Sequence, residues 1–329
     1  MTAASTHPPF DPELGAALAA MAPELQHPLL PGDIPAWRAE LQELLPVSDE
    51  TLRRGGAVEL EERQVPGPAG APGLSVLILR PARGSGPWPG IYHTHGGGMV
   101  LGNNRFGADE VATWVEQIGV VGVSVEYRLA PEHPHPAPVE DRYAGLVWTA
   151  EHAGELGIDP ARLIIAGASA GGGLAAGTAL LARDRGGPAL SHQILMCPML
   201  DDRCVTPSSQ ELDREGVWDR TSNLTGWTAL LGDACGGPDV SPYAAPARAR
   251  DLSGLPPAFI DVGSVETFRD EDIEYAARLS RAGVSVEFHL WPGGFHGFDM
   301  MVPQSELARI ARATRLAYLR RALPRGPVR

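Results

Sequence analysis

Three features are scarce in this sequence: cysteines, long apolar runs and positive charge. The three cysteines, Cys197, Cys204 and Cys235, are odd in number and show neither Cys-x-x-Cys spacing nor the pattern of a disulfide framework, which favours a reducing compartment. No stretch is long and apolar enough to span a membrane, and residues 1–22 lack the basic segment and apolar core of a signal peptide. We therefore expect a soluble, cytoplasmic protein that does not bind a membrane.

The charge balance narrows the class of partner. The chain has 27 Lys and Arg residues against 40 Asp and Glu residues, a formal net charge of −13, which disfavours nucleic acid and anionic membrane surfaces as partners. The Arg-rich segment 320–329 is short, and we expect it to be a solvated end. The length of 329 residues allows one large α/β domain or two smaller ones, and we find no internal repeat.

From residue 57 onward, apolar strand-like runs alternate with helical patterns. This alternation predicts an α/β fold with about eight strands in a mostly parallel sheet and helices on both faces. The first two strands are joined by a Pro/Gly loop without a helix, so we expect them to form an antiparallel edge. The strands are expected at 58–65, 74–79, 90–94, 120–127, 162–166, 192–197, 258–262 and 285–291, and the helices at 106–118, 138–153, 170–184, 270–282 and 305–323.

Residues 167–172, Gly-Ala-Ser-Ala-Gly-Gly, are the most informative motif. They lie between a predicted strand and a predicted helix, which is the setting of a nucleophile elbow. Glycines on both sides permit the sharp turn, and the turn exposes the hydroxyl of Ser169 at the end of the sheet. Ser169 is therefore the predicted nucleophile of an acyl-transfer reaction.

A second glycine-rich loop, residues 95–98 (His-Gly-Gly-Gly), also follows a predicted strand. Backbone N–H groups of such a loop approach a ligand closely and can stabilise an oxyanion. The alternative is a flexible glycine turn, but the order and setting of both motifs favour catalysis. For His95 itself we expect a role in holding this loop.

The base and the acid of a triad are sought among loops at the same edge of the sheet. His296 follows the last predicted strand and is the best-placed of ten histidines. The acid should precede it in the chain, and Glu266 lies in the loop after strand 258–262. Asp261 lies inside that strand, and Asp270 is expected to begin the next helix, where acidic side chains favour the N-terminal dipole.

Five segments together resemble the hormone-sensitive-lipase-like bacterial esterases of the α/β-hydrolase superfamily. They are residues 95–98 (HGGG), 127–133 (YRLAPEH), 167–172 (GASAGG), 268–271 (FRDE) and 296–298 (HGF). The resemblance covers about residues 55–325. It implies an α/β-hydrolase fold, with Ser169 as nucleophile and His296 as base. It also implies an oxyanion hole made by the N–H groups of Gly97, Gly98 and Ala170.

Two positions depart from the pattern of this family. Ala168 stands where many relatives have Asp or Thr, and Glu266 stands where the family usually has Asp. A glutamate can do the same work with one more methylene group. The departures bear on the choice of substrate and leave the reaction unchanged.

The predicted function is hydrolysis of carboxylic esters with short to medium acyl chains through an acyl-enzyme intermediate. An amidase, a peptidase or a lactonase would use the same triad, and some relatives with this fold are small-molecule receptors without catalysis. The proposed reaction implies no metal and no organic cofactor. His133 and His135 form a Pro-rich His-x-His pair, which we interpret as a surface loop rather than a metal site because no third ligand is apparent. The expected partner is a small-molecule ester, and the sequence leaves the oligomeric state open, with a homodimer as one option.

The segments outside the alternating pattern predict a cap. Residues 1–55 contain two amphipathic stripes, Leu14/Leu18/Met21 after a helix start at Asp11-Pro12, and Trp37/Leu41/Leu44. Two short amphipathic helices cannot form a core of their own, so their apolar sides must pack on another part of the protein. We therefore assign residues 1–55 to a helical cap and residues 56–329 to the catalytic domain.

The interval 199–257 interrupts the alternation, at a place where α/β proteins accept insertions over the sheet. We expect residues 199–228 to add to the cap and pocket, with Trp218, Trp227 and Met99 contacting substrate. The alternative is a helical excursion that buries its tryptophans.

Overall fold

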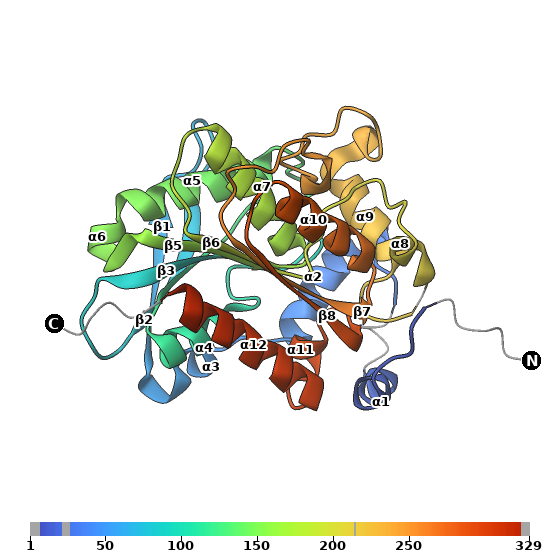
Figure 1. Ribbon diagram of the computed structural model, residues 1–329, viewed down its shortest axis with the longest axis horizontal. Coiled ribbons are helices and arrows are strands. Elements are labelled where there is room, and N and C mark those ends of the chain that lie inside the picture. Colours follow the sequence, from blue (N-terminus) through green and yellow to red (C-terminus); the bar gives the residue numbers. More distant parts are fainter. Residues whose placement is uncertain (1–6, 22–26, 214, 324–329) are drawn as a thin grey trace, which may run out of the picture.

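A single mixed sheet organises the computed structural model, which describes residues 7–21, 27–213 and 215–323 (Figure 1). Within this part of the chain the sheet has eight strands in the order β1-β2-β4-β3-β5-β6-β7-β8. β2 pairs antiparallel with β1 and with β4, and the remaining pairs are parallel. The strands are β1 (Val58–Val65), β2 (Leu74–Pro81), β3 (Trp88–Thr94), β4 (Val121–Val125), β5 (Ile158–Ala168), β6 (His192–Met196), β7 (Ala258–Val265) and β8 (Val286–Phe295).

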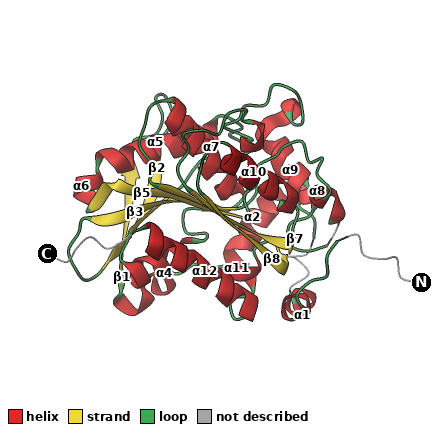
Figure 2. Ribbon diagram, viewed as in Figure 1, coloured by secondary structure: helices red, strands yellow, loops and turns green. Residues whose placement is uncertain are grey.

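Helices cover both faces of the sheet (Figure 2). One face packs against α5, α7 and α10, and the other packs against α4 and α12. The helices are α1 (Pro12–Ala20), α2 (Ile34–Leu44), α3 (Asp49–Arg53), α4 (Ala108–Ile118), α5 (Ala137–Glu151), α6 (Ala153–Leu156), α7 (Ala170–Asp184), α8 (Ser208–Glu211), α9 (Arg220–Leu231), α10 (Arg269–Arg281), α11 (Phe298–Met301) and α12 (Glu306–Ala322). The 3-10 helices of the described residues are η2 (Pro31–Asp33), η3 (Arg54–Gly56), η4 (Gly232–Ala234) and η5 (Pro246–Arg248).

The central strand β5 shows how the apolar runs form the core. Ile164 and Ile165 are both fully buried but belong to the clusters on opposite faces of the sheet. Successive side chains of a strand point to opposite faces, so a strand covered on both sides is apolar at every position. This explains why the buried strands read as continuous apolar runs rather than as alternating ones.

The α/β fold and the mostly parallel sheet predicted from the sequence are confirmed, including the antiparallel first pair. The main differences lie at element ends. The strand expected at 258–262 continues to Val265, and the strand expected at 285–291 continues to Phe295. The helix expected at 138–153 divides at His152 into α5 and α6. Residues 1–6 of the segment searched for a signal peptide, residues 22–26 of the predicted cap and residues 324–329 of the Arg-rich end lie outside the described residues.

The two N-terminal helices pack on different parts of the molecule. Leu14 and Leu18 of α1 pack with Trp291 of β8, in a cluster at the outer edge of the sheet. α2 packs instead against a second cluster through Trp37 and Leu41. Leu44 was expected to share this covered stripe, but the helix ends at this residue and its side chain is 39 % exposed.

Two further expectations concern cysteines and membrane spans. Cys197, Cys204 and Cys235 are free thiols, as expected from their spacing. Among the helices of the described residues, none has the length and apolar character needed to cross a bilayer.

Candidate active site

Ser169 occupies a sharp turn between β5 and α7. β5 ends at Ala168 and α7 begins at Ala170, so the turn is a single residue. Ser169 has φ 57° and ψ −125°, a conformation that a residue with a side chain rarely adopts. Such backbone strain is typical of functional positions, where the surrounding structure maintains it.

The glycines around Ser169 are required by close backbone contacts. A β-carbon on Gly167 would lie 2.2 Å from the carbonyl oxygen of Gly171, and one on Gly171 would lie 2.2 Å from that of Thr94. Neither contact is possible for a real β-carbon, because backbone atoms cannot move away independently. This turn therefore requires glycine at positions 167 and 171, which explains the Gly-x-Ser-x-Gly pattern.

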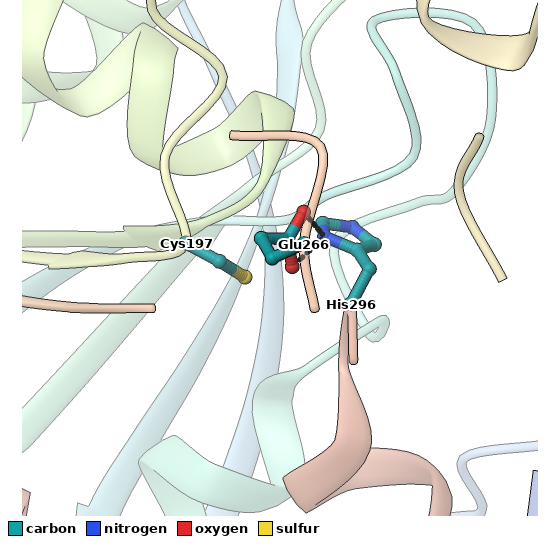
Figure 3. A group of neighbouring side chains, drawn as sticks. All are labelled: Cys197, Glu266 and His296. Carbon is teal, nitrogen blue, oxygen red and sulfur yellow. Dashed lines mark hydrogen bonds and ion pairs between the residues drawn. The ribbon is translucent and has the colours of Figure 1, made fainter. Parts of the chain in front are cut away.

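His296 and Glu266 form a hydrogen-bonded pair at the carboxyl edge of the sheet. Glu266 directly follows β7 and His296 directly follows β8, and the two strands are parallel neighbours. The Nδ1 atom of His296 lies 2.9 Å from Oε2 and 3.0 Å from Oε1 of Glu266 (Figure 3). Because an ionised carboxylate only accepts hydrogen bonds, the imidazole carries a proton on Nδ1. The lone pair of the neutral ring is then on Nε2.

The other acidic side chains considered from the sequence have different partners. Asp261 accepts hydrogen bonds from Nε1 of Trp291 at 3.0 Å and from Nε of Arg315 at 2.9 Å. Asp270 accepts from the N–H of Ser208 at 2.8 Å and forms an ion pair with Arg269. Of these three carboxylates, Glu266 is the one that is hydrogen-bonded to His296.

Ser169 and His296 line the same cavity. α2 contributes Trp37 and Leu41 to its wall, and the segment before α9 contributes Trp218. The complete lining is Trp37, Leu41, His93, Gly96, Gly97, Leu101, Phe106, Gly107, Asp109, Glu110, Ala168, Ser169, Met196, Cys197, Val217, Trp218, His296, Gly297, Asp299, Met300, Met301, Arg312 and Arg315. Both segments expected to act as a cap therefore reach the cavity.

The glycine-rich loop lies beside Ser169 and has a backbone conformation that depends on glycine. Gly97 has φ 106° and Gly98 has φ 61°, both in the region that favours glycine. Within the described part of the chain, the backbone N–H groups of Gly97, Gly98 and Ala170 have no hydrogen-bond acceptor. Of these three residues, Gly97 lines the cavity of Ser169, whereas Gly98 and Ala170 are not among its lining residues. Free backbone N–H groups are the type of donor that stabilises an oxyanion.

His95 contacts the backbone of this glycine-rich loop. Its Nδ1 lies 2.8 Å from the carbonyl oxygen of Gly96, and its ring stacks on Tyr127 with 4.2 Å between centroids. Burial lowers the pKa of His95 to about 3, so the ring is neutral at physiological pH. These contacts agree with the predicted role of His95 in holding the loop.

The three residues expected to contact substrate lie in different places. Trp218 lines the cavity, with its ring centroid 6.2 Å from that of His296. Met99 and Trp227 are fully buried in the cluster that also packs against α2, and they are not among the residues that line the cavity. Trp227 follows the alternative interpretation, in which the excursion between β6 and β7 buries a tryptophan in its core.

Cys197 lines the cavity, although the sequence analysis considered it only as one of three cysteines and not as a site residue. Its Sγ and the ligand atoms of Glu266 and His296 lie within 4.8 Å of one another, the only such group of three metal-ligand types among the described residues (Figure 3). Burial and the nearby charge of Glu266 raise the pKa of the Cys197 thiol. A protonated thiol is a poor metal ligand, and Glu266 and His296 already bond to each other. The sequence could have indicated that Cys197 lies near the site, because it directly follows β6 and therefore lies at the same edge of the sheet as the other site residues.

The chain is similar in sequence to a known family and to characterised proteins. A family model described as alpha/beta hydrolase fold matches residues 91–300. The chain is 39 % identical over 277 residues to the carboxylesterase NlhH of Mycobacterium tuberculosis, an alignment covering 81 % of this chain and 83 % of that protein. It is 37 % identical over 237 residues to the esterase LipI of the same organism, covering 71 % and 73 % of the two chains.

Solved structures show the same similarity over nearly the whole chain. A bacterial heroin esterase superimposes with a TM-score of 0.89 at 39 % identity, covering 96 % of this chain and 98 % of the other. The esterase LipW of Mycobacterium marinum superimposes with a TM-score of 0.84 at 32 % identity, covering 97 % and 99 %.

Proposed function

Since this chain belongs to the hormone-sensitive-lipase-like family of α/β hydrolases and is a carboxylic ester hydrolase, we propose that it cleaves esters with a catalytic triad. In this triad Ser169 is the nucleophile, His296 is the general base and Glu266 is the acid that orients the histidine. The observation that carries this assignment is the hydrogen bond between His296 and Glu266 at the cavity that Ser169 also lines. It gives the histidine the tautomer that a general base needs.

The first half of the reaction forms an acyl enzyme. Nε2 of His296 takes the proton of the Ser169 hydroxyl as Oγ attacks the ester carbonyl carbon. The carbonyl oxygen becomes an oxyanion that accepts hydrogen bonds from the N–H groups of Gly97, Gly98 and Ala170. The imidazolium, stabilised by the Glu266 carboxylate, then gives its proton to the leaving alcohol as the C–O bond breaks.

The second half regenerates the enzyme. A water molecule gives a proton to Nε2 of His296 and attacks the acyl carbon of the Ser169 ester. The second tetrahedral intermediate uses the same N–H donors and collapses as His296 returns the proton to Oγ of Ser169. The products are a carboxylic acid and an alcohol, and the protein ends in its starting state.

The cavity walls support a preference for short to medium acyl chains. Trp37 and Leu41 of α2 line the cavity, and so do Val217 and Trp218 from the segment before α9. Large side chains from two separate segments thus occupy the wall of the cavity that Ser169 lines, which favours small groups over long ones. In this proposal residues 1–55 and 199–228 act as the cap, and residues 56–329 form the catalytic domain.

Active-site labelling and an ester panel test the proposal together. A fluorophosphonate should modify Ser169 alone, as located by peptide mass spectrometry, and Ser169→Ala should abolish labelling. Turnover of p-nitrophenyl esters should fall by about three to six orders of magnitude in Ser169→Ala while thermal unfolding shows a folded protein. Retained turnover in the purified variant would exclude this serine as the nucleophile.

A further inference from the structure

One wall of the catalytic cavity is charged, although most of its lining is apolar. It is formed by α4, α11 and α12, which lie on the same side of the sheet (Figure 1). The charged side chains that reach the cavity are Asp109, Glu110, Asp299, Arg312 and Arg315. None of them is used by the ester-cleavage steps above.

Glu110 is the unusual member of this wall. Its side chain is only 10 % exposed, and both carboxyl oxygens are buried without a hydrogen-bond partner. Nε of Arg312 lies 3.6 Å from Oε2, too far for a hydrogen bond, and this Nε is itself buried without a hydrogen-bond partner. A buried carboxyl with no partner costs stability unless something else compensates it.

Apart from Arg312, the other charged side chains on this wall have close partners or are partly exposed to solvent. Arg315 donates to Asp261 at 2.8 and 2.9 Å and also forms an ion pair with Asp299. Asp109 is 28 % exposed and lies 3.6 Å from Arg312. Glu110 therefore remains the carboxyl group of this wall that accepts no hydrogen bond, with the unpartnered Nε of Arg312 at 3.6 Å as its cationic neighbour.

The charge balance decides which kind of group Glu110 fits. Counting Asp261 behind the wall, four carboxyl groups face the two guanidinium groups of Arg312 and Arg315, so the wall is net negative. Glu110 also lies in the first turn of α4, where the helix dipole favours its ionised form. A cationic group is attracted to such a wall, and an anionic group is repelled by it.

We propose that Glu110 anchors a subsite for a positively charged amine or ammonium group of the ester substrate. The proposal rests on the proposed function, since the subsite opens into the cavity of Ser169 and His296. It makes Glu110 a specificity-determining residue, without a part in breaking the ester bond.

The test uses ester pairs that differ in charge but hardly in shape. Acetylcholine and 3,3-dimethylbutyl acetate place the difference on the alcohol side. Ethyl trimethylammonioacetate and ethyl 3,3-dimethylbutanoate place it on the acyl side. For each pair the measured quantity is the ratio of kcat/KM for the cationic ester to kcat/KM for the neutral ester. Intrinsic reactivity differs within a pair, but it cancels when the same ratio is compared between enzyme variants.

Glu110→Gln should lower this ratio by about tenfold in at least one pair, because it removes a charge at nearly constant volume. Glu116→Gln is the matched control, since Glu116 lies on α4, pairs with Arg54 and does not line the cavity. An unchanged ratio in both pairs, or a preference for carboxylate-bearing esters, would overturn the proposal. If the wild-type enzyme hydrolyses neither neutral ester, the failure belongs to the proposed function instead.

A second measurement needs no variant. Tetramethylammonium chloride should inhibit hydrolysis of the neutral ester competitively, whereas sodium chloride at equal ionic strength should not. This experiment keeps the proposal testable if Glu110→Gln does not fold. Equal effects of the two salts would count against a cation subsite.

The pH dependence of the ratio gives a third readout. Burial raises the pKa of Glu110 to about 7, with Arg312 and Arg315 opposing and Asp109 and Asp299 adding to this shift. His93 also lines the cavity, but burial lowers its pKa to about 3 and keeps it neutral. A quaternary ammonium does not titrate, so the ratio should rise between pH 6 and pH 8 as Glu110 ionises. A flat ratio across this range in the wild type would contradict the assignment.

Discussion

Both carboxylate oxygens of Glu266 lie within hydrogen-bond distance of Nδ1 of His296, at 2.9 and 3.0 Å. Glu266 directly follows β7, and His296 directly follows the parallel neighbour of that strand, β8. The carboxylate is 1 % exposed, so solvent does not screen the pair. A buried acceptor of this kind fixes the ring orientation and stabilises the imidazolium that forms during catalysis.

Replacing Glu266 by Gln should therefore lower kcat by about two to four orders of magnitude with a much smaller change in KM. Glu266→Asp should keep more activity, because the charge remains although the carboxylate is one methylene shorter. Asp270→Asn is the control, since Asp270 bonds to Ser208 and Arg269 instead of His296. Steady-state kinetics on p-nitrophenyl butyrate measure all three. Loss of turnover in folded Asp270→Asn with activity retained in Glu266→Gln would reverse the assignment of the acid.

Ser169 should carry a stability cost that its function requires. Its φ of 57° and ψ of −125° are rarely adopted by a residue with a β-carbon, and such strain costs about 1 to 3 kcal/mol. Ser169→Gly should then be more stable than Ser169→Ala by about 1 kcal/mol, after the greater freedom of unfolded glycine is subtracted. Both variants lack the hydroxyl, so both should be inactive. Chemical denaturation of the pair checks the difference, and equal midpoints would show that the turn is not strained.

Gly98 and Trp218 provide a test of the glycine-rich loop. A β-carbon on Gly98 would lie 2.2 Å from Cη2 of the Trp218 ring, and the φ of 61° adds a penalty for any side chain. Gly98→Ala should therefore lower both thermal stability and kcat, since the loop or the ring must move. The double variant Gly98→Ala/Trp218→Ala should recover part of the stability but not all of it. A double-mutant cycle measures the coupling, and strictly additive effects would mean that the two residues do not meet.

The sequence predicted the residues at the ends of parallel strands well, for a geometric reason. Parallel strands of a sheet end at a common edge, so Ser169, Glu266 and His296 are brought to one edge although they are distant in the chain. The glycines around Ser169 carried further information, because close backbone contacts leave no room for a side chain. The end of β7 was less predictable, since Gly263 and Ser264 read as turn residues but are buried strand residues in the sheet.

Side-chain directions outside the regular pattern could not be predicted in the same way. Trp218 and Trp227 lie in the same irregular interval, yet one lines the cavity and the other packs in a buried cluster. Composition does not show which face of an inserted helix meets the cavity. Glu110 was missed because an acidic residue in the first turn of a helix reads as a solvated group that favours the dipole. Its burial depends on the packing of α12 across from α4, which no local pattern reveals.

Leu41 should limit the length of the acyl chain that the cavity accepts. It lies on α2, lines the catalytic cavity and also lines a second pocket on its other side, together with Phe106. The intact enzyme should hydrolyse p-nitrophenyl acetate and butyrate faster than the palmitate ester, without interfacial activation. Leu41→Ala removes part of the wall between the two spaces, so the optimum should shift toward longer chains, with octanoate gaining about tenfold relative to acetate. Leu44→Ala is the matched control, because Leu44 lies on the same helix but is 39 % exposed and does not line the cavity. Equal or faster turnover of long-chain emulsions by the intact protein would instead indicate a lipase whose cavity α2 does not close.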